Sequence, residues 1–283
     1  MYPLIEIGIM EIMSWDLCLY LSYIVTTVLL IRNRPVDYPA TRPQIFWGSL
    51  IFFFAGLLGA VLLHMLIHLD KFSGMPLDEA LNSLGTAYLG APILGLLFVW
   101  IYCREIKVSF LRAVDYIAPY LMLSRAFGRL GCLMEGCCRG IYSNLPWAQD
   151  FGEGAYRHPT QAYALIAALS IFIAGIKAYP RLKPYKGAML FMVILLYGIM
   201  RFFNEFLRID SPELIGQFHL SNLAMLVIIA IGITGLYLIY RKAEEKDRLL
   251  EGLKRMIVVF LISLLVITLI ALPILSLLRI ILQ

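Results

Sequence analysis

Eight long apolar segments are the feature of this sequence that most constrains its fold. A hydrocarbon core about 30 Å thick requires roughly 20 apolar residues per spanning helix. The chain has 283 residues, of which 61% are hydrophobic and only 15% are charged. The apolar segments cover residues 15–31, 45–68, 84–103, 113–133, 159–176, 187–208, 220–240 and 256–278. The sequence therefore predicts an all-α polytopic membrane protein.

The last apolar segment follows a highly charged stretch, residues 241–255. We therefore expect residues 1–240 to form a seven-helix membrane domain, and residues 241–283 to form a charged linker and an eighth, C-terminal transmembrane helix. The first segment is preceded by Glu6 and Glu11 and by no Lys or Arg. A secretory signal peptide would begin with a basic region, so we expect a retained helix.

The basic residues predict the orientation of the chain in the membrane. Most of the 24 Lys and Arg residues follow the first, third, fifth and seventh segments, and loops rich in Lys and Arg face the cytoplasm. Both termini should then lie outside, with the connections 69–83, 134–158 and 209–219. The net charge of +5 comes from these loops, so it does not indicate nucleic-acid binding.

Two charged stripes lie near the outer ends of apolar segments. Arg125 and Arg129 are four residues apart and share one helical face. The second stripe contains Tyr197, Arg201, Glu205 and Arg208. One interpretation is a structural Arg201–Glu205 pair with the other arginines reaching toward the interface. The alternative is an anionic ligand, such as a phospholipid phosphate held by arginine forks.

Three histidines are candidates for proton transfer on the outer side. His64 and His68 lie at i and i+4 near the end of the second segment, and His158 ends the longest outer loop. A neutral imidazole accepts a proton near pH 7. The His64–His68 pair also has metal-ligand spacing, although packing or interfacial hydrogen bonding fits that spacing as well.

Cysteines and glycines are concentrated at the beginning of the longest outer loop. The cysteines are Cys132, Cys137 and Cys138, and the glycines are Gly128, Gly131, Gly136 and Gly140. A C-x4-C-C spacing is not a usual zinc pattern, so we predict no metal site. A Cys132–Cys137 disulfide is permitted in an outer compartment. We expect small residues packed in a tight turn, where the backbone can approach another helix or a phosphate.

Four sequence motifs resemble the prolipoprotein diacylglyceryl transferase family. They are GRLGCLMEGCCRG at residues 128–140, LPWA at 145–148, RHPTQAY at 157–163 and YGIMRFFNEFLRID at 197–210. The resemblance implies a seven-helix enzyme of the bacterial cytoplasmic membrane with its active site on the outer face. It also implies transfer of diacylglyceryl from phosphatidylglycerol to the lipobox cysteine of prolipoproteins, with release of glycerol phosphate and without a cofactor.

The resemblance assigns roles that fit this chemistry. A phosphate leaving group needs donors already in place, and a thiol nucleophile needs a base or a positive field. The expected catalytic residues are Arg129, Arg201, His158 and Glu205. The expected substrate-binding residues are Arg125, Gly128, Gly131, Cys132, Gly136, Gly140, Gln161, Tyr197 and Arg208.

The departures from the family pattern concern proton transfer. Leu89 and Ala91 replace a polar residue and a glycine, Asp16 lies where an aromatic residue is usual, and Ala164 replaces a glutamate. The alternative bases are then His64, His68 and Asp16, or the arginines alone lower the pKa of the thiol. Two other functions remain open: a divergent transferase with another acceptor, and a phospholipid-binding or transport protein without catalysis.

Overall fold

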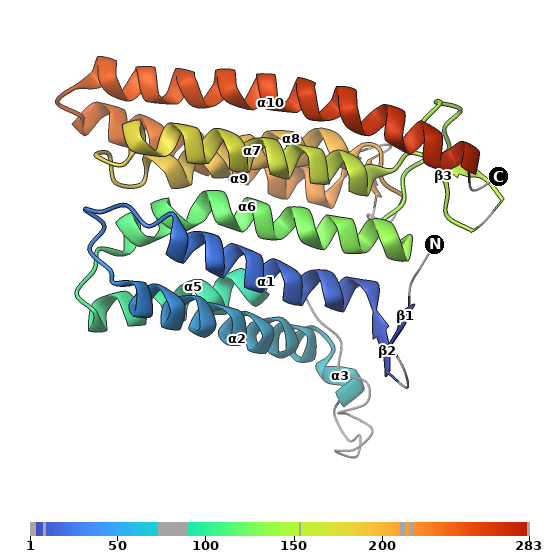
Figure 1. Cartoon of the computed structure of the whole chain (residues 1–283), viewed down its shortest axis with the longest axis horizontal. Coiled ribbons are helices and arrows are strands. Elements are labelled where there is room, and N and C mark those ends of the chain that lie inside the picture. The colour runs from blue at the N-terminus through green and yellow to red at the C-terminus, as the bar shows by residue number, and fades with distance from the viewer. Residues whose placement is uncertain are drawn as a thin grey trace. The chain divides into compact units, whose positions relative to one another are not determined.

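The computed structural model describes residues 4–7, 10–72, 90–152, 154–209, 213–215 and 218–281, most of which are helical (Figure 1). The helices are α1 (Ser14–Arg32), α2 (Arg42–Ile67), α3 (Leu69–Phe72), α5 (Gly90–Glu105), α6 (Phe110–Glu135), α7 (Thr160–Leu182), α8 (Ala188–Glu205), α9 (Leu220–Lys242) and α10 (Lys246–Ile281). Six of the described helices, α1, α2, α7, α8, α9 and α10, are long and apolar enough to cross a membrane. The prediction of an all-α polytopic membrane protein is confirmed.

Three short antiparallel hairpins accompany the helices in the part of the chain that the structure describes. Their strands are β1 (Leu4–Ile7) with β2 (Met10–Met13), β3 (Gln149–Asp150) with β4 (Tyr156–Arg157), and β5 (Glu213–Ile215) with β6 (Phe218–His219). The β3–β4 hairpin belongs to the longest predicted outer loop. At the tip of this hairpin, the Asp150 carboxylate accepts hydrogen bonds from the backbone amides of Gly152 and Gly154 at 2.9 and 3.2 Å.

The two remaining predicted spans correspond to α5 and α6. The described part of α5 begins at Gly90, so the first residues of that predicted span, including Leu89, lie outside the described residues. Helix α6 has 26 residues and contains Asp115, Arg125 and Arg129. Most of the predicted loop 69–83 and part of the loop 209–219 also lie outside the described residues.

The charged stretch before the last helix is mainly helical and is not an extended linker. Helix α9 continues to Lys242 and α10 begins at Lys246, so only residues 243–245 separate them. Lys, Arg and Glu are good helix formers, and the Arg248 guanidinium donates a hydrogen bond of 3.0 Å to the Glu245 carboxylate at this turn. The apolar pattern located the membrane-spanning part of α10 but missed its charged first turns.

The chain forms two compact units, residues 27–113 and residues 1–26 with 114–283. In the first unit, α2 packs on α5 where Gly59 meets Gly90. A Cβ at Gly59 would lie 2.3 Å from the Gly90 carbonyl oxygen, so only glycine permits this approach. In the second unit, α7 packs on α8 and α10, and α8 packs on α9.

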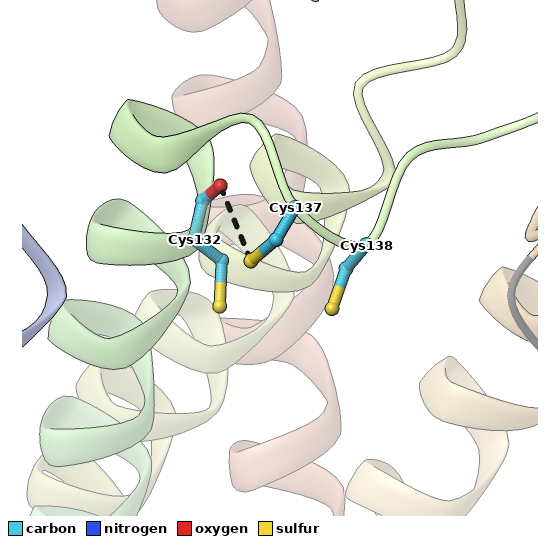
Figure 2. A group of neighbouring side chains, drawn as sticks. All are labelled: Cys132, Cys137 and Cys138. Atoms are coloured by element: carbon cyan, nitrogen blue, oxygen red, sulfur yellow. Dashed lines mark hydrogen bonds between the residues drawn. The ribbon is translucent and has the colours of Figure 1, made fainter. Parts of the chain in front are cut away.

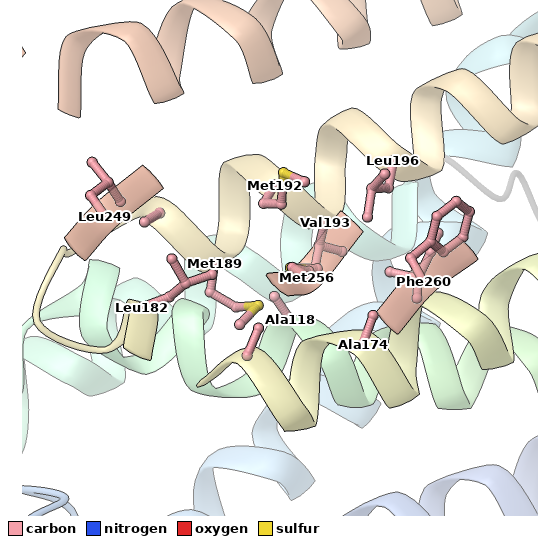
Figure 3. Close-up of a cluster of buried hydrophobic side chains, with 13 residues drawn as sticks. Ala118, Ala174, Leu182, Met189, Met192, Val193, Leu196, Leu249, Met256 and Phe260 are labelled. Carbon is pink, nitrogen blue, oxygen red and sulfur yellow. The ribbon is translucent and has the colours of Figure 1, made fainter. Parts of the chain in front are cut away.

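The core of the second unit is an apolar cluster contributed by α6, α7, α8 and α10. Ala118, Leu182, Met189, Met256 and Phe260 belong to it, and each is at most 5% exposed (Figure 3). Burial of a Leu, Met or Phe side chain contributes about 1.5–3 kcal/mol. Because Met256 and Phe260 come from α10, this helix is an integral part of the second unit.

Asp115 explains one of the charges within an apolar segment. Its carboxylate accepts hydrogen bonds from the backbone amides of Gly187 at 2.5 Å and Leu190 at 2.9 Å. These amides belong to the first turn of α8, where the helix dipole favours a negative charge. Asp115 therefore caps α8 and fixes its position relative to α6.

Helix α10 also holds the β3–β4 loop. The Gln149 side-chain amide donates a hydrogen bond of 2.8 Å to the Leu275 carbonyl. The Arg279 guanidinium donates a hydrogen bond of 2.7 Å to the Leu145 carbonyl and lies 3.8 Å from the centre of the Tyr156 ring. The eighth helix thus contacts the loop that joins α6 to α7.

We expect Arg279→Ala to loosen this loop without unfolding the protein. The variant loses one charge-assisted hydrogen bond and one cation–π contact, together about 2–3 kcal/mol of local stabilisation. Hydrogen exchange of residues 145–157 should accelerate in detergent. Arg255→Ala, at an exposed position of the same helix, is the matched control, and equal exchange in both variants would contradict the role of Arg279.

Candidate active site

A cavity of about 190 Å³ lies among α6, α7 and α8. Its lining residues are Arg125, Tyr163, Ala164, Ala167, Ala168, Ile171, Tyr197, Met200, Arg201, Phe203, Asn204 and Leu207. Two arginines and an asparagine therefore share the cavity with a wall of alanines and larger apolar side chains. This combination suits a ligand with an anionic group and an apolar body.

Arg201 is one of the two arginines that line the cavity. Its Nη2 lies 2.6 Å from Oε2 of Glu205, which is fully buried. Its Nη1 is also buried, and no described residue accepts a hydrogen bond from it. The Arg201–Glu205 pair predicted as one interpretation is present, and it leaves half of the guanidinium fork available to a ligand.

Further positive charge surrounds this pair. The Arg125 guanidinium stacks 4.5 Å from the centre of the Tyr197 ring. Arg129 and Arg208 both lie close enough to Arg201 to repel its charge. Four arginines and one buried glutamate thus lie in this part of the described structure, and this excess of basic side chains favours an anion.

Arg208 lies just beyond the end of α8, where three chain segments meet. The Gly140 amide donates to the His158 carbonyl at 3.0 Å, the His158 amide donates to the Ile141 carbonyl at 3.0 Å, and the Ile141 amide donates to the Leu207 carbonyl at 2.9 Å. Gly140 also pairs with Arg208 as an isolated β-bridge. These backbone bonds place Gly140, the last residue of the GRLGCLMEGCCRG motif, beside Arg208, the last residue of the second charged stripe.

His158 is connected to the cavity through Tyr163. The His158 Nδ1 lies 3.1 Å from the Tyr163 hydroxyl, which also accepts a hydrogen bond of 2.9 Å from Trp147 Nε1. Burial lowers the pKa of His158 below its usual 6.5, so the imidazole is neutral at pH 7. Tyr163 was not among the predicted site residues, although its hydroxyl within RHPTQAY was a signal for it.

We expect His158→Asn to slow the reaction by about 100-fold and to remove the acidic limb of its pH profile. The wild-type rate should fall as the pH drops through the pKa of His158, below 6.5, because the protonated imidazole cannot accept a proton. The measurement is the initial rate of catalysis across the acidic range. Tyr163→Phe keeps the imidazole and should retain the limb, as should the control His64→Asn. An unchanged profile in His158→Asn would exclude this base.

The N-terminal turn of α7 holds the cysteine turn in place. The Gln161 side-chain amide donates to the Cys137 carbonyl, and the Thr160 hydroxyl donates to the Cys138 carbonyl at 2.6 Å. Asn204 in turn donates to the Thr160 carbonyl at 3.2 Å. Oε1 of Gln161 and Oδ1 of Asn204 are buried and accept no hydrogen bond from the described residues. Asn204 lines the cavity and was not among the predicted site residues, although it lies within YGIMRFFNEFLRID.

The three cysteines of this turn come together as free thiols (Figure 2). The Sγ atoms of Cys132, Cys137 and Cys138 all lie within 4.8 Å of one another. The Cys132–Cys137 disulfide that the sequence permitted is not formed.

The four motif glycines have different environments. A Cβ at Gly128 would meet nothing within 4 Å, whereas one at Gly131 would lie 2.9 Å from the Cα of Trp15 on α1. Gly136 has a φ of 76° and ends α6. A Cβ at Gly140 would lie 2.6 Å from the His158 carbonyl oxygen. The close approaches therefore serve helix packing at Gly131 and loop pairing at Gly140.

The alternative bases are not among the residues that line the cavity. His64 and His68 belong to the unit 27–113, where their rings stack 4.4 Å apart. His68 Nδ1 lies 3.0 Å from the His64 carbonyl and closes the end of α2. Asp16 is half-buried in the first turn of α1.

The fold and the site define an integral membrane protein with a cavity that combines arginines and apolar walls. A family model described as prolipoprotein diacylglyceryl transferase matches residues 3–238. The chain belongs to this family of membrane transferases, which confirms the resemblance of its motifs. Helix α10 begins at Lys246, so all of it lies beyond the matched residues.

Curated relatives carry the same description. A phosphatidylglycerol–prolipoprotein diacylglyceryl transferase of Clostridium tetani is 29% identical over 220 residues, covering 74% of this chain and 86% of the relative. One from Gloeobacter violaceus is 28% identical over 257 residues, covering 86% and 94%. One from Thermotoga petrophila is 30% identical over 228 residues, covering 77% and 76%.

Proposed function

We propose that this protein transfers the diacylglyceryl group of phosphatidylglycerol to the thiol of a lipobox cysteine in prolipoproteins and releases glycerol phosphate. The observation that carries the proposal is the buried Nη1 of Arg201, a donor without a described partner in a cavity with apolar walls. A phosphate oxygen satisfies this donor. The alanines and Ile171 accommodate the apolar part of the same lipid.

The reaction exchanges one bond at the glyceryl carbon that carries the phosphate. The acceptor thiolate forms a C–S bond with this carbon, the C–O bond to phosphate breaks, and the electron pair goes to the phosphate oxygen. Arg201 and Arg129 stabilise the charge that develops there. Glu205 holds Arg201 in position through its 2.6 Å contact. Arg125, Arg208 and Tyr197 support the binding of the headgroup.

The thiol proton goes to His158, directly or through the Tyr163 hydroxyl. His158 is a suitable acceptor because burial keeps its pKa low and its imidazole neutral. The hydrogen bond from Trp147 to Tyr163 fixes the hydroxyl between the imidazole and the cavity. The surrounding arginines favour the thiolate as well.

We also propose that this end of the bundle faces the outer side of the bacterial cytoplasmic membrane. The distribution of Lys and Arg supports this orientation. Phosphatidylglycerol and the signal-peptide cysteine would then both reach the cavity from the outer leaflet. A reporter that is active only outside the cytoplasm, fused after α10, should be active if the orientation is right.

The decisive assay uses purified protein in detergent with phosphatidylglycerol and a synthetic lipobox peptide. Mass spectrometry of the peptide should show a diacylglyceryl adduct, and glycerol phosphate should appear in equal amount. The adduct should be absent with a Cys→Ser peptide and strongly reduced in Arg129→Ala. Arg248→Ala is the matched control, because Arg248 is exposed and pairs with Glu245 between α9 and α10.

A divergent transferase with another acceptor is favoured by one observation. Ala164, which lies where the family pattern has a glutamate, lines the cavity, so this wall lacks a carboxylate. Release of glycerol phosphate without a peptide adduct would support this second function. Lipid binding without release would instead indicate a phospholipid-binding protein.

A further inference from the structure

The three thiols of Cys132, Cys137 and Cys138 form the one group of metal-ligating side chains of its kind among the described residues. They are half-buried, they carry no disulfide, and none of them lines the cavity. Figure 2 shows Cys132 at the end of α6, and Cys137 and Cys138 in the turn that follows. The proposed transfer reaction uses none of these thiols.

The backbone of this turn is held in a conformation that brings the thiols together. The Cys132 carbonyl accepts hydrogen bonds from the amides of Gly136 and Cys137 at 3.1 and 3.2 Å. Cys138 has a φ of 58°, which is uncommon for a residue with a side chain and costs about 1–3 kcal/mol. The side chains of Gln161 and Thr160 bind the Cys137 and Cys138 carbonyls. Such strain persists only where the surroundings enforce it.

The spacing of the thiols fits a metal ion. Zinc–thiolate bonds are about 2.3 Å long, so sulfurs around one ion lie about 4 Å apart, and the three Sγ atoms are already within 4.8 Å of one another. The sequence spacing C-x4-C-C did not indicate a metal site, because the usual zinc patterns place two cysteine ligands two to four residues apart in one short turn. Here the end of α6 and a left-handed turn bring the ligands together instead.

The charge balance fits as well. Three thiolates and one divalent cation carry one net negative charge, and the three thiol protons pass to solvent. The guanidinium groups of Arg129 and Arg208 both lie near the Cys138 side chain. An anionic metal–thiolate complex is therefore neutralised by neighbouring arginines.

We propose that Cys132, Cys137 and Cys138 form a tri-thiolate site for a thiophilic metal ion of the Zn²⁺ type. The site is separate from the cavity, and it stands whether or not the transfer reaction is established. A bound ion would join the end of α6 to the turn that Thr160 and Gln161 hold against α7.

The test is a titration of the reduced, full-length protein with Cd²⁺, followed by its sulfur-to-metal charge-transfer absorption. One equivalent of Cd²⁺ per chain should bind, and Cd²⁺ should displace Zn²⁺ from protein loaded with Zn²⁺ beforehand. Loss of an outer-shell partner weakens metal sites by about 10–100-fold, so loss of a ligand in Cys137→Ser should weaken binding by about 100-fold or more. The control carries Cys18→Ser and Cys103→Ser, two buried cysteines outside the cluster, and should bind as the wild type does.

Alkylation of the wild-type protein gives a second readout that needs no variant. Bound Cd²⁺ should protect Cys132, Cys137 and Cys138 from an alkylating reagent, as peptide mass spectrometry would show. The proposal is overturned if the reduced wild type shows no charge-transfer absorption. It is equally overturned if Cys137→Ser binds Cd²⁺ as tightly as the control, or if the three thiols are alkylated at the same rate with and without Cd²⁺.

Discussion

Arg201→Ala is expected to lower the rate of diacylglyceryl transfer by about 100- to 1000-fold, the range seen when one preorganised donor to a developing anion is removed. The Arg201 guanidinium lines the cavity, and its Nη1 has no acceptor among the described residues. In the proposed reaction, a phosphate oxygen of the lipid accepts a hydrogen bond from this donor. The measurement is peptide adduct formation with saturating phosphatidylglycerol.

The same substitution should also destabilise the fold, and the two effects can be separated. Removing Arg201 leaves Glu205 fully buried without its 2.6 Å partner, and breaking a buried pair costs about 3–5 kcal/mol. Combining Arg201→Ala with Glu205→Gln also neutralises the buried carboxylate. The double variant should regain much of the thermal stability but none of the transfer rate. A double variant that transfers at the wild-type rate would rule out a catalytic role for Arg201.

Gly140→Ala is expected to abolish activity by a different route. The added Cβ would lie 2.6 Å from both the Cβ and the carbonyl oxygen of His158, and 2.8 Å from the Leu207 carbonyl oxygen. Backbone atoms on both sides cannot move away without breaking the bonds that join the three segments. We expect a loss of about 2–4 kcal/mol in unfolding free energy and displacement of His158 and Arg208 from the site.

Gly128→Ala in the same motif is the matched control for stability. Gly128 lies within α6, and a Cβ there would meet nothing within 4 Å. Alanine in a helix is favoured over glycine by about 0.5–1 kcal/mol, so this variant should unfold at the same temperature or a higher one. The explanation fails if Gly140→Ala melts as Gly128→Ala does.

The membrane-spanning helices were predictable because a lipid environment requires a run of apolar residues, which is a local property of the sequence. The same reasoning grouped Arg125, Tyr197 and Arg201, which come from two helices and line one cavity. Spacing along each helix and a common membrane depth sufficed to group them. The Arg201–Glu205 pair followed from their four-residue separation.

What could not be predicted depends on contacts between distant segments. No local pattern shows that Asp115 caps α8 or that Gly131 packs on Trp15. The link from His158 to Tyr163 depends on how the turn before α7 folds back. The convergence of three thiols depends on one left-handed cysteine. The start of α10 was missed because a charged, amphipathic helix end has the composition of a linker.

The contact between α10 and the β3–β4 loop has a consequence for the order of assembly. Gln149 and Leu145 find their partners 126 and 134 residues further along the chain. During synthesis, the β3–β4 loop is therefore made long before α10. Its contacts with Leu275 and Arg279 can form only after the end of α10 has been synthesised and inserted. Removal of the final helix should then leave this loop without these two hydrogen bonds.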